Sequence, residues 1–239
     1  MRLEGARILV AGGAHRVGRA IALDLAEGGA DVAISYHSSA GSAEETRAAI
    51  EGLGRRTAAF RADAAVPGQM AQLVEQTVEA LGGIDCYIHC PSGGFEPRSP
   101  EQIDEALWDT AVDSTAKGFM FGAQAAHRHM QAGSVIVAVT DVAAMQPWRA
   151  FAAHCAAKAA QVQLMKCLAL AWGKDGVRVC GVAPGPVLLP DEQRGATEET
   201  ALGVIGSPED VCQAIRYLLA AEFVTGQNLI VDGGRLLRP

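Results

Sequence analysis

Short runs of apolar, often β-branched residues alternate with longer alanine-rich amphipathic stretches along the whole chain. The apolar runs predict strands at 7–11, 31–35, 56–61, 84–89, 134–140, 177–182 and 228–231. The stretches between them predict helices at 17–27, 42–52, 67–81, 100–130, 151–172 and 208–220. This alternation is typical of parallel strands joined by right-handed helical crossovers. We therefore expect an α/β fold with a doubly wound parallel sheet of about seven strands and helices on both faces.

Length and composition favour one domain that acts on small molecules. A chain of 239 residues that is 49% hydrophobic buries one sizeable core, so residues 1–239 are expected to form a single domain. The net charge of -7, with no block of like charge, argues against nucleic acid or an anionic membrane as partner. No apolar stretch reaches the roughly 18 residues of a spanning helix, and no signal segment precedes the first strand. We expect a cytoplasmic protein.

Cysteine and histidine spacing gives no sign of a metal site or of disulfides. The six cysteines contain no C-x-x-C pair and lie mostly in apolar segments, as expected of reduced structural thiols. His127 and His129 stand two apart on a predicted helix and so point to different faces. No metal is expected.

A glycine-bearing turn joins the first strand to the first helix, and it predicts a dinucleotide site of the Rossmann type. Gly12 permits a tight turn and Gly18 permits close helix packing. The backbone around His15, Arg16 and Val17 opens the helix, whose N-terminus offers N–H groups to a diphosphate. A glycine-rich turn alone is weak evidence, but its place between a strand and a helix strengthens it.

The end of the second strand indicates which dinucleotide is bound. It runs into His37, Ser38 and Ser39, with no acid to hold a free ribose 2′-hydroxyl. Together with Arg16, these residues supply cationic and hydroxyl donors for a 2′-phosphate, so NADP(H) is favoured over NAD(H). The alternative is that Arg16 is an ordinary solvated charge. Asp63, after the third strand, either accepts from the adenine amino group or caps the following helix.

Several motifs together resemble the short-chain dehydrogenase/reductase family, and within it the pteridine-reductase-like branch. The resemblance covers essentially the whole chain. It rests on the turn at 12–18, the strand end at 36–38, and the segments 182–187, 207–210, 223–227 and 231–234.

The resemblance implies a catalytic centre that is altered in this chain. Members typically use an Asn, a Ser, and a Tyr followed four residues later by Lys. The corresponding positions here are Thr115, Asp141, His154 and Lys158. An acid at the Ser position is similar to the pteridine reductases. In the family the Tyr hydroxyl protonates the developing oxyanion and Lys holds the nicotinamide ribose. His154 could donate that proton; Asp141, if in contact, would favour its charged form, whereas Lys158 would disfavour it.

The resemblance also implies further cofactor contacts and an assembly. The additional cofactor residues are Ala64, Ser92, Gly93, Pro184, Gly185 and Val187, with Lys158 shared between cofactor and chemistry. Relatives pair their long helices across a dimer within a tetramer, so a homo-oligomer built as a dimer of dimers is expected. The family's substrate lid corresponds to residues 188–206, which are shorter than usual and polar.

The sequence leaves the activity open between three hypotheses. The favoured one is an NADPH-dependent oxidoreductase that reduces a carbonyl or a pterin-like C=N bond, with His154 as the acid. A catalytically impaired nucleotide-binding pseudo-enzyme, acting as regulator or partner subunit, is the main alternative. A 3-oxoacyl-thioester reductase is the third. Phe95 and Trp148 either stack on a planar substrate or pack in the core or an interface.

Overall fold

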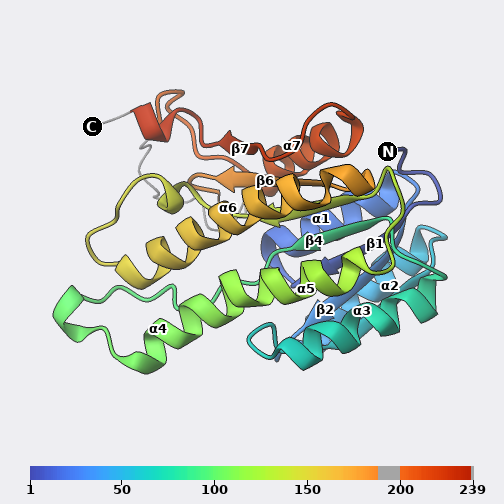
Figure 1. Cartoon of the computed structure of the whole chain (residues 1–239), viewed down its shortest axis with the longest axis horizontal. Coiled ribbons are helices and arrows are strands. Elements are labelled where there is room, and N and C mark those ends of the chain that lie inside the picture. The colour runs from blue at the N-terminus through green and yellow to red at the C-terminus, as the bar shows by residue number, and fades with distance from the viewer. Residues whose placement is uncertain (188–199, 238–239) are drawn as a thin grey trace.

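The computed structural model describes residues 1–187 and 200–237 of the chain, and its centre is a seven-stranded parallel sheet. Figure 1 shows the sheet between two layers of helices. The strand order is β3-β2-β1-β4-β5-β6-β7, and every neighbouring pair is parallel. The strands are β1 Arg7–Ala11, β2 Asp31–Tyr36, β3 Thr57–Arg61, β4 Cys86–His89, β5 Val135–Val139, β6 Arg178–Pro184 and β7 Asn228–Val231. The predicted doubly wound α/β fold is confirmed.

The helices lie close to their predicted places, with one exception. They are α1 Arg16–Glu27, α2 Ala40–Gly52, α3 Pro67–Leu81, α4 Glu105–Val112, α5 Gly118–His127, α6 Ala152–Trp172 and α7 Pro208–Ala220. Short 3-10 turns lie at Pro100–Gln102, Val142–Ala144, Gly173–Asp175 and Arg235–Leu237.

The single helix predicted over 100–130 is wrong. The chain forms only a 3-10 turn after Pro100, and Ile103 is extended, so α4 begins later, where the Asp104 carboxylate accepts from the Leu107 N–H. A π-helical turn, Asp113–Lys117, separates α4 from α5, and α5 ends at His127. Apolar periodicity therefore identified the element but not its interruptions.

Alternation along the buried strands divides the core between the two faces. Ile8 and Val10 of β1 pack on the face covered by α1, α2 and α7, whereas Leu9 and Ala11 pack on the face covered by α3, α5 and α6. Both faces are apolar because helices cover both, as is usual in parallel sheets.

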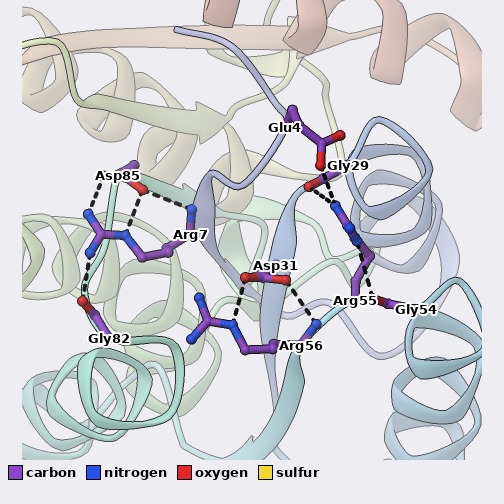
Figure 2. A network of polar contacts seen from close by, with 9 residues as sticks. All are labelled: Glu4, Arg7, Gly29, Asp31, Gly54, Arg55, Arg56, Gly82 and Asp85. Atoms are coloured by element: carbon purple, nitrogen blue, oxygen red, sulfur yellow. Dashed lines mark hydrogen bonds and ion pairs between the residues drawn. The ribbon is translucent and has the colours of Figure 1, made fainter.

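Ion pairs fix the amino-terminal edge of the sheet (Figure 2). The Asp85 carboxylate accepts from the backbone N–H of Arg7 at 2.9 Å and from its Nε and Nη2 at 2.8 and 2.6 Å. Asp31 accepts in the same way from the backbone N–H and Nε of Arg56. Arg7 and Asp31 begin β1 and β2, while Asp85 and Arg56 directly precede β4 and β3. One pair therefore joins β1 to β4 and the other joins β2 to β3, which leaves the opposite edge for the site.

The six cysteines are free thiols, Cys86, Cys180 and Cys212 among them buried. Burial raises the pKa of Cys90 and of Cys212 to about 12, so these thiols are unreactive at neutral pH.

Among the helices that the structure describes, none combines the length and apolar character of a membrane span.

Candidate active site

The loops that follow the strands converge at the carboxyl-terminal edge of the sheet. The chain runs from β1 outward to β2 and β3 on one side and from β4 outward to β7 on the other. Such a reversal opens a crevice at the ends of β1 and β4, where open α/β sheets bind ligands. The predicted site residues are distributed around this crevice.

The turn between β1 and α1 has the geometry of a diphosphate loop. Gly12 has a φ of +73°, and a Cβ on Gly18 would overlap the Gly12 carbonyl oxygen, so both positions need glycine. The Gly12 N–H donates to Ser35 Oγ at 3.1 Å, and Thr46 Oγ1 donates to the Ala14 carbonyl at 3.1 Å. These bonds tie the turn to β2 and α2.

The N-terminus of α1 is open to an anion. Its cap residue, His15, makes no side-chain capping bond, and the first turn carries no acidic residue. The first amides of a helix have no partner within the helix and lie at the positive end of its dipole. Val17 lies partly buried in this turn, and Arg16 adopts a φ of +52° where glycine would be unstrained.

A further basic side chain, that of Arg61, lies beside His37, one of the predicted 2′-phosphate residues. His37 and Ser38 are exposed, and His37 Nε2 lies 3.7 Å from Asp63 Oδ2. Arg61, the last residue of β3, donates from Nε to the His37 carbonyl at 3.1 Å. Arg61 was not predicted as a site residue, although it ends the strand that pairs with β2 and so lies at the same edge of the sheet as His37.

Asp63 does not cap the following helix, so that alternative is wrong. The helix α3 begins at Pro67 and its cap residue is Val66. The Asp63 carboxylate instead accepts from the Ala65 N–H at 2.9 Å and shapes the loop after β3. Ala64, in the same loop, packs so closely beneath the first residue of α5 that a Cβ on Gly118 would not fit.

Asp141, His154 and Lys158 come together at the ends of β5 and α6. His154 and Lys158 stand one turn apart in α6 and are both buried. His154 Nε2 lies 3.4 Å from Asp141 Oδ2, while Asp141 Oδ1 accepts from the Ala143 N–H at 2.8 Å. That backbone bond holds the carboxylate toward the imidazole. The contact on which an effect of Asp141 on His154 depends is therefore present.

Lys158 is held at the end of β5. Its Nζ donates to the Val139 carbonyl at 2.9 Å. Burial lowers the pKa of Lys158 to about 8, although the nearby Asp141 carboxylate opposes that shift. The ammonium group of Lys158 has N–H groups besides the one that donates to Val139, and these are suited to bind a ribose hydroxyl.

Thr115 lies in the π-helical turn and is fully buried. Its hydroxyl contacts Ser92 Oγ at 3.5 Å, so it faces the loop after β4. Gly93, the next residue of that loop, donates its N–H to Ser114 Oγ at 2.8 Å. The structure therefore joins Thr115, Ser92 and Gly93 in one group of contacts.

His89 is a residue of the site whose contacts the sequence did not indicate. It ends β4 and is fully buried, with Nδ1 2.7 Å from the Tyr87 hydroxyl and Nε2 3.1 Å from the Ser114 carbonyl. Burial lowers the pKa of His89 to about 3, so the ring is neutral. Because a carbonyl only accepts, Nε2 carries the proton and Nδ1 accepts from Tyr87. His89 thus anchors the π-helical turn to the sheet.

Pro184, Gly185 and Val187 lie at the end of β6, next to the crevice. The Gly185 N–H donates to the Val231 carbonyl at 2.9 Å, and a Cβ at Gly185 would overlap Asp232. Val187 forms a bridge with Gly206. Most of the lid expected at 188–206 lies outside the described residues.

Three aromatic side chains, Phe95, Trp148 and Phe151, form a cluster with His154. Phe95 contacts Phe151, His154 and Trp148, with centroid separations of 4.7, 4.9 and 6.3 Å. His154 is only 3% exposed, whereas Phe95 is 58% exposed. Packing of Phe95 in the core is therefore wrong. Phe151, whose contacts link two loops distant in sequence, was not predicted.

Comparison with known proteins identifies the family. A family model described as enoyl-(acyl carrier protein) reductase matches residues 12–235. A short-chain dehydrogenase from Burkholderia cenocepacia, solved in complex with NADP, superposes with a TM-score of 0.92 at 32% identity, covering 99% of this chain and 100% of that one. The chain belongs to the short-chain dehydrogenase/reductase family.

Relatives in this short-chain dehydrogenase/reductase family act on varied substrates. The 3β-hydroxysteroid dehydrogenase 1 of Eggerthella lenta is 33% identical, covering 99% of this chain and 96% of that protein. The L-rhamnose 1-dehydrogenase (NAD(P)(+)) of a Sphingomonas species is 35% identical, covering 97% and 96%. A blue fluorescent protein from a metagenomic library, solved with NADPH, superposes with a TM-score of 0.92 at 28% identity.

No metal centre is apparent in residues 1–187 and 200–237, where no three His, Cys, Asp or Glu side chains are grouped to hold an ion. His127 and His129 instead lie near Asp175 and Glu75, respectively.

Proposed function

We propose that the protein is an NADPH-dependent reductase of a carbonyl or C=N substrate, with His154 as the proton donor. The observation that carries the proposal is the Asp141–His154 contact, one helical turn from Lys158 at the crevice. An acid that orients an imidazole, beside a lysine suited to a ribose, is a combination that proton transfer to a reduced carbonyl needs.

The residues around the crevice fit NADPH. The turn from Gly12 to Gly18 leaves room for a diphosphate against the uncapped N-terminus of α1. Arg16, His37, Ser38 and Ser39 would hold the 2′-phosphate and Asp63 the adenine amino group. The remaining contacts would come from His15, Val17, Ala64, Ser92, Gly93, Lys158, Pro184, Gly185 and Val187.

The proton path follows from the two imidazole nitrogens. Bound NADPH would supply a hydride to the substrate carbon. His154 keeps the Nε2 proton toward Asp141, and Nδ1, buried and without a partner among the described residues, gives its proton to the substrate oxygen or nitrogen. Asp141 stabilises the charged imidazole before transfer, and its orientation is kept by Ala143. Lys158 orients the ribose.

The pterin-like substrate rests on Asp141, because an acid at this position resembles the pteridine reductases. The relatives named for activity on a hydroxysteroid and on a sugar support a ketone or alcohol substrate equally well. We therefore propose reduction of a carbonyl or C=N bond as the reaction class. A planar pterin and a 3-oxoacyl thioester are two candidate substrates within this class.

The reductase proposal is tested by NADPH oxidation over dihydropterins, quinones and 3-ketoacyl thioesters. We expect His154→Gln to lower kcat by about 100-fold or more while NADPH still binds, because only proton donation is lost. Lys158→Met should instead weaken NADPH binding. Unchanged turnover in His154→Gln would refute the acid role. Tight NADPH binding with no oxidation over the panel would favour the regulatory alternative.

We also propose a homo-oligomer, arranged as a dimer of dimers. Its support is exposed apolar surface on α4 and α6, where Trp108 is 45% and Leu170 is 88% exposed. The edge strand β7 adds Ile230, also exposed. Light scattering should give a mass near four chains, and Leu170→Glu should lower it. A monomeric wild-type protein would contradict the proposal.

A further inference from the structure

The ring of Phe95 lies over His154 among aromatic side chains, in a space that is open to solvent on one side because Phe95 is 58% exposed. Phe95 and Phe151 stack, with their planes 24° apart, while Phe95 meets both Trp148 and His154 edge-on at 76°. Trp148 and His154 lie nearly parallel, 15° apart and 6.2 Å between centroids. The rings of Trp148, Phe151 and His154 therefore border one side of the phenyl ring of Phe95, and we call the partly open space between these three rings the enclosure.

The enclosure contains polar atoms that the protein itself does not satisfy. Nε1 of Trp148 and Nδ1 of His154 are both buried and have no hydrogen-bond partner in the described part of the chain. Buried polar groups are normally paired, so an unpaired pair beside a catalytic position points to a ligand. The hollow next to these rings has essentially no free volume for a water molecule.

Phe95 is held so that its side chain can leave the enclosure without unfolding a large loop. Before it, Gly93 is bonded to Ser114, and Gly94 packs against Ala111. After it, the Arg98 N–H donates to the Ala150 carbonyl at 2.8 Å. Only residues 95–97 lie between these fixed points, and Phe95 is the one whose ring covers His154. Rotation of an exposed side chain is fast.

We infer that Phe95 occupies the place of a substrate's planar six-membered ring, and that Trp148 and Phe151 are specificity-determining residues for an aryl ketone or a similar flat heterocycle. A phenyl-sized ring fits because one is already there. Such a ring would stack on Phe151 and displace Phe95, bringing its carbonyl toward His154 Nδ1. This inference rests on the proposed reductase function for the reaction but not for the binding.

A matched pair of ketones tests the inference. Acetophenone and cyclohexyl methyl ketone have the same carbon skeleton, but only acetophenone has a flat ring. We expect calorimetry with NADP⁺ present to show tighter binding of acetophenone by about 2- to 10-fold, the range of one ring–ring contact. Phe151→Leu should remove that preference. Phe95→Ala should tighten acetophenone binding by a similar factor, because no internal ring competes.

The control is Phe223→Leu, which alters an exposed ring outside the enclosure and should change nothing. Equal binding of the two ketones by the wild type, or a preference that survives Phe151→Leu in a variant with native circular dichroism, overturns the inference. Preferential binding of acetophenone without NADPH oxidation would support the inference about the enclosure and refute the reductase proposal. NADPH oxidation with the same KM for both ketones, unchanged in Phe95→Ala, would support the reductase proposal and refute the inference.

Discussion

Arg16 keeps a backbone conformation that costs free energy. Its φ of +52° lies in the left-handed region, where a residue other than glycine, asparagine or aspartate is disfavoured by about 1–2 kcal/mol. Glycine would avoid this cost at the same position in the turn. We propose that the Arg16 side chain offsets this strain by binding the 2′-phosphate of NADPH.

Substitution of Arg16 by glycine should therefore separate folding from cofactor choice. We expect Arg16→Gly to change the free energy of unfolding by less than about 1 kcal/mol, since relief of strain opposes the higher chain entropy. NADPH affinity should fall by about 5- to 50-fold through lost charge-assisted hydrogen bonds. NADH affinity should stay within about twofold.

Arg61→Ala makes the same comparison without touching the turn, and should lower NADPH affinity in the same direction. Calorimetric titration with both nucleotides gives the ratio directly. Equal loss of NADPH and NADH affinity in both variants would remove these arginines from 2′-phosphate recognition.

Residue spacing predicted part of the site because the fold converts it into geometry. The four-residue step from His154 to Lys158 is one turn of α6. Asp141 lies just after β5, where it caps the 3-10 turn Val142–Ala144. Arg61 and Phe151 could not be found in this way. Their partners, His37 and Phe95, lie on other loops, and only the register of β2 with β3 and the closure of two loops bring them together.

At the scale of elements, the break between α4 and α5 is held by a buried histidine. The hydrophobic pattern over 100–130 continues through the π-helical turn, so the pattern could not reveal it. The strand β4 supplies His89, whose Nε2–H satisfies the Ser114 carbonyl in that turn. The interruption thus depends on a contact between distant parts of the chain.

Replacement of His89 should destabilise the protein and remove part of its acid sensitivity. His89→Phe leaves the Ser114 carbonyl and the Tyr87 hydroxyl unpaired, a cost of about 1–3 kcal/mol at pH 7. In the folded wild type the pKa of His89 is lowered from 6.5 to about 3. Only the unfolded chain binds the proton in that interval, so wild-type stability falls as pH drops, by up to about 1.4 kcal/mol per unit.

The difference between wild type and His89→Phe should therefore shrink from pH 7 to pH 5 in urea unfolding experiments. Tyr87→Phe is the matched control, because it removes one hydrogen bond but keeps the titrating ring. A constant difference across this pH range would show that His89 is not held neutral.

At the scale of the whole molecule, the two edges of the sheet have different roles. The carboxyl-terminal edge carries the exposed side chains of His15 and His37 and, in the described part of the chain, the unpartnered Nδ1 of His154. The amino-terminal edge is instead closed by ion pairs across strands (Figure 2). Arg7 donates three hydrogen bonds to Asp85, so this pair fixes β1 against β4 at the end of the sheet opposite the crevice. We expect this contact to keep the two strands that border the crevice aligned.

Asp85→Asn should show how much this edge stabilises the fold. The Arg7 side chain lowers the pKa of Asp85, so the folded state favours the carboxylate. Its stabilisation is present above the ordinary carboxyl pKa and is lost as pH falls through the lowered folded value. We expect Asp85→Asn to lose about 1–3 kcal/mol at pH 7 and to converge with wild type in strong acid. Glu44→Gln, which alters an exposed pair on α2, should have little effect at any pH. If the difference in free energy of unfolding between wild type and Asp85→Asn stays constant from neutral to acid pH, the pair aligns the strands without stabilising them electrostatically.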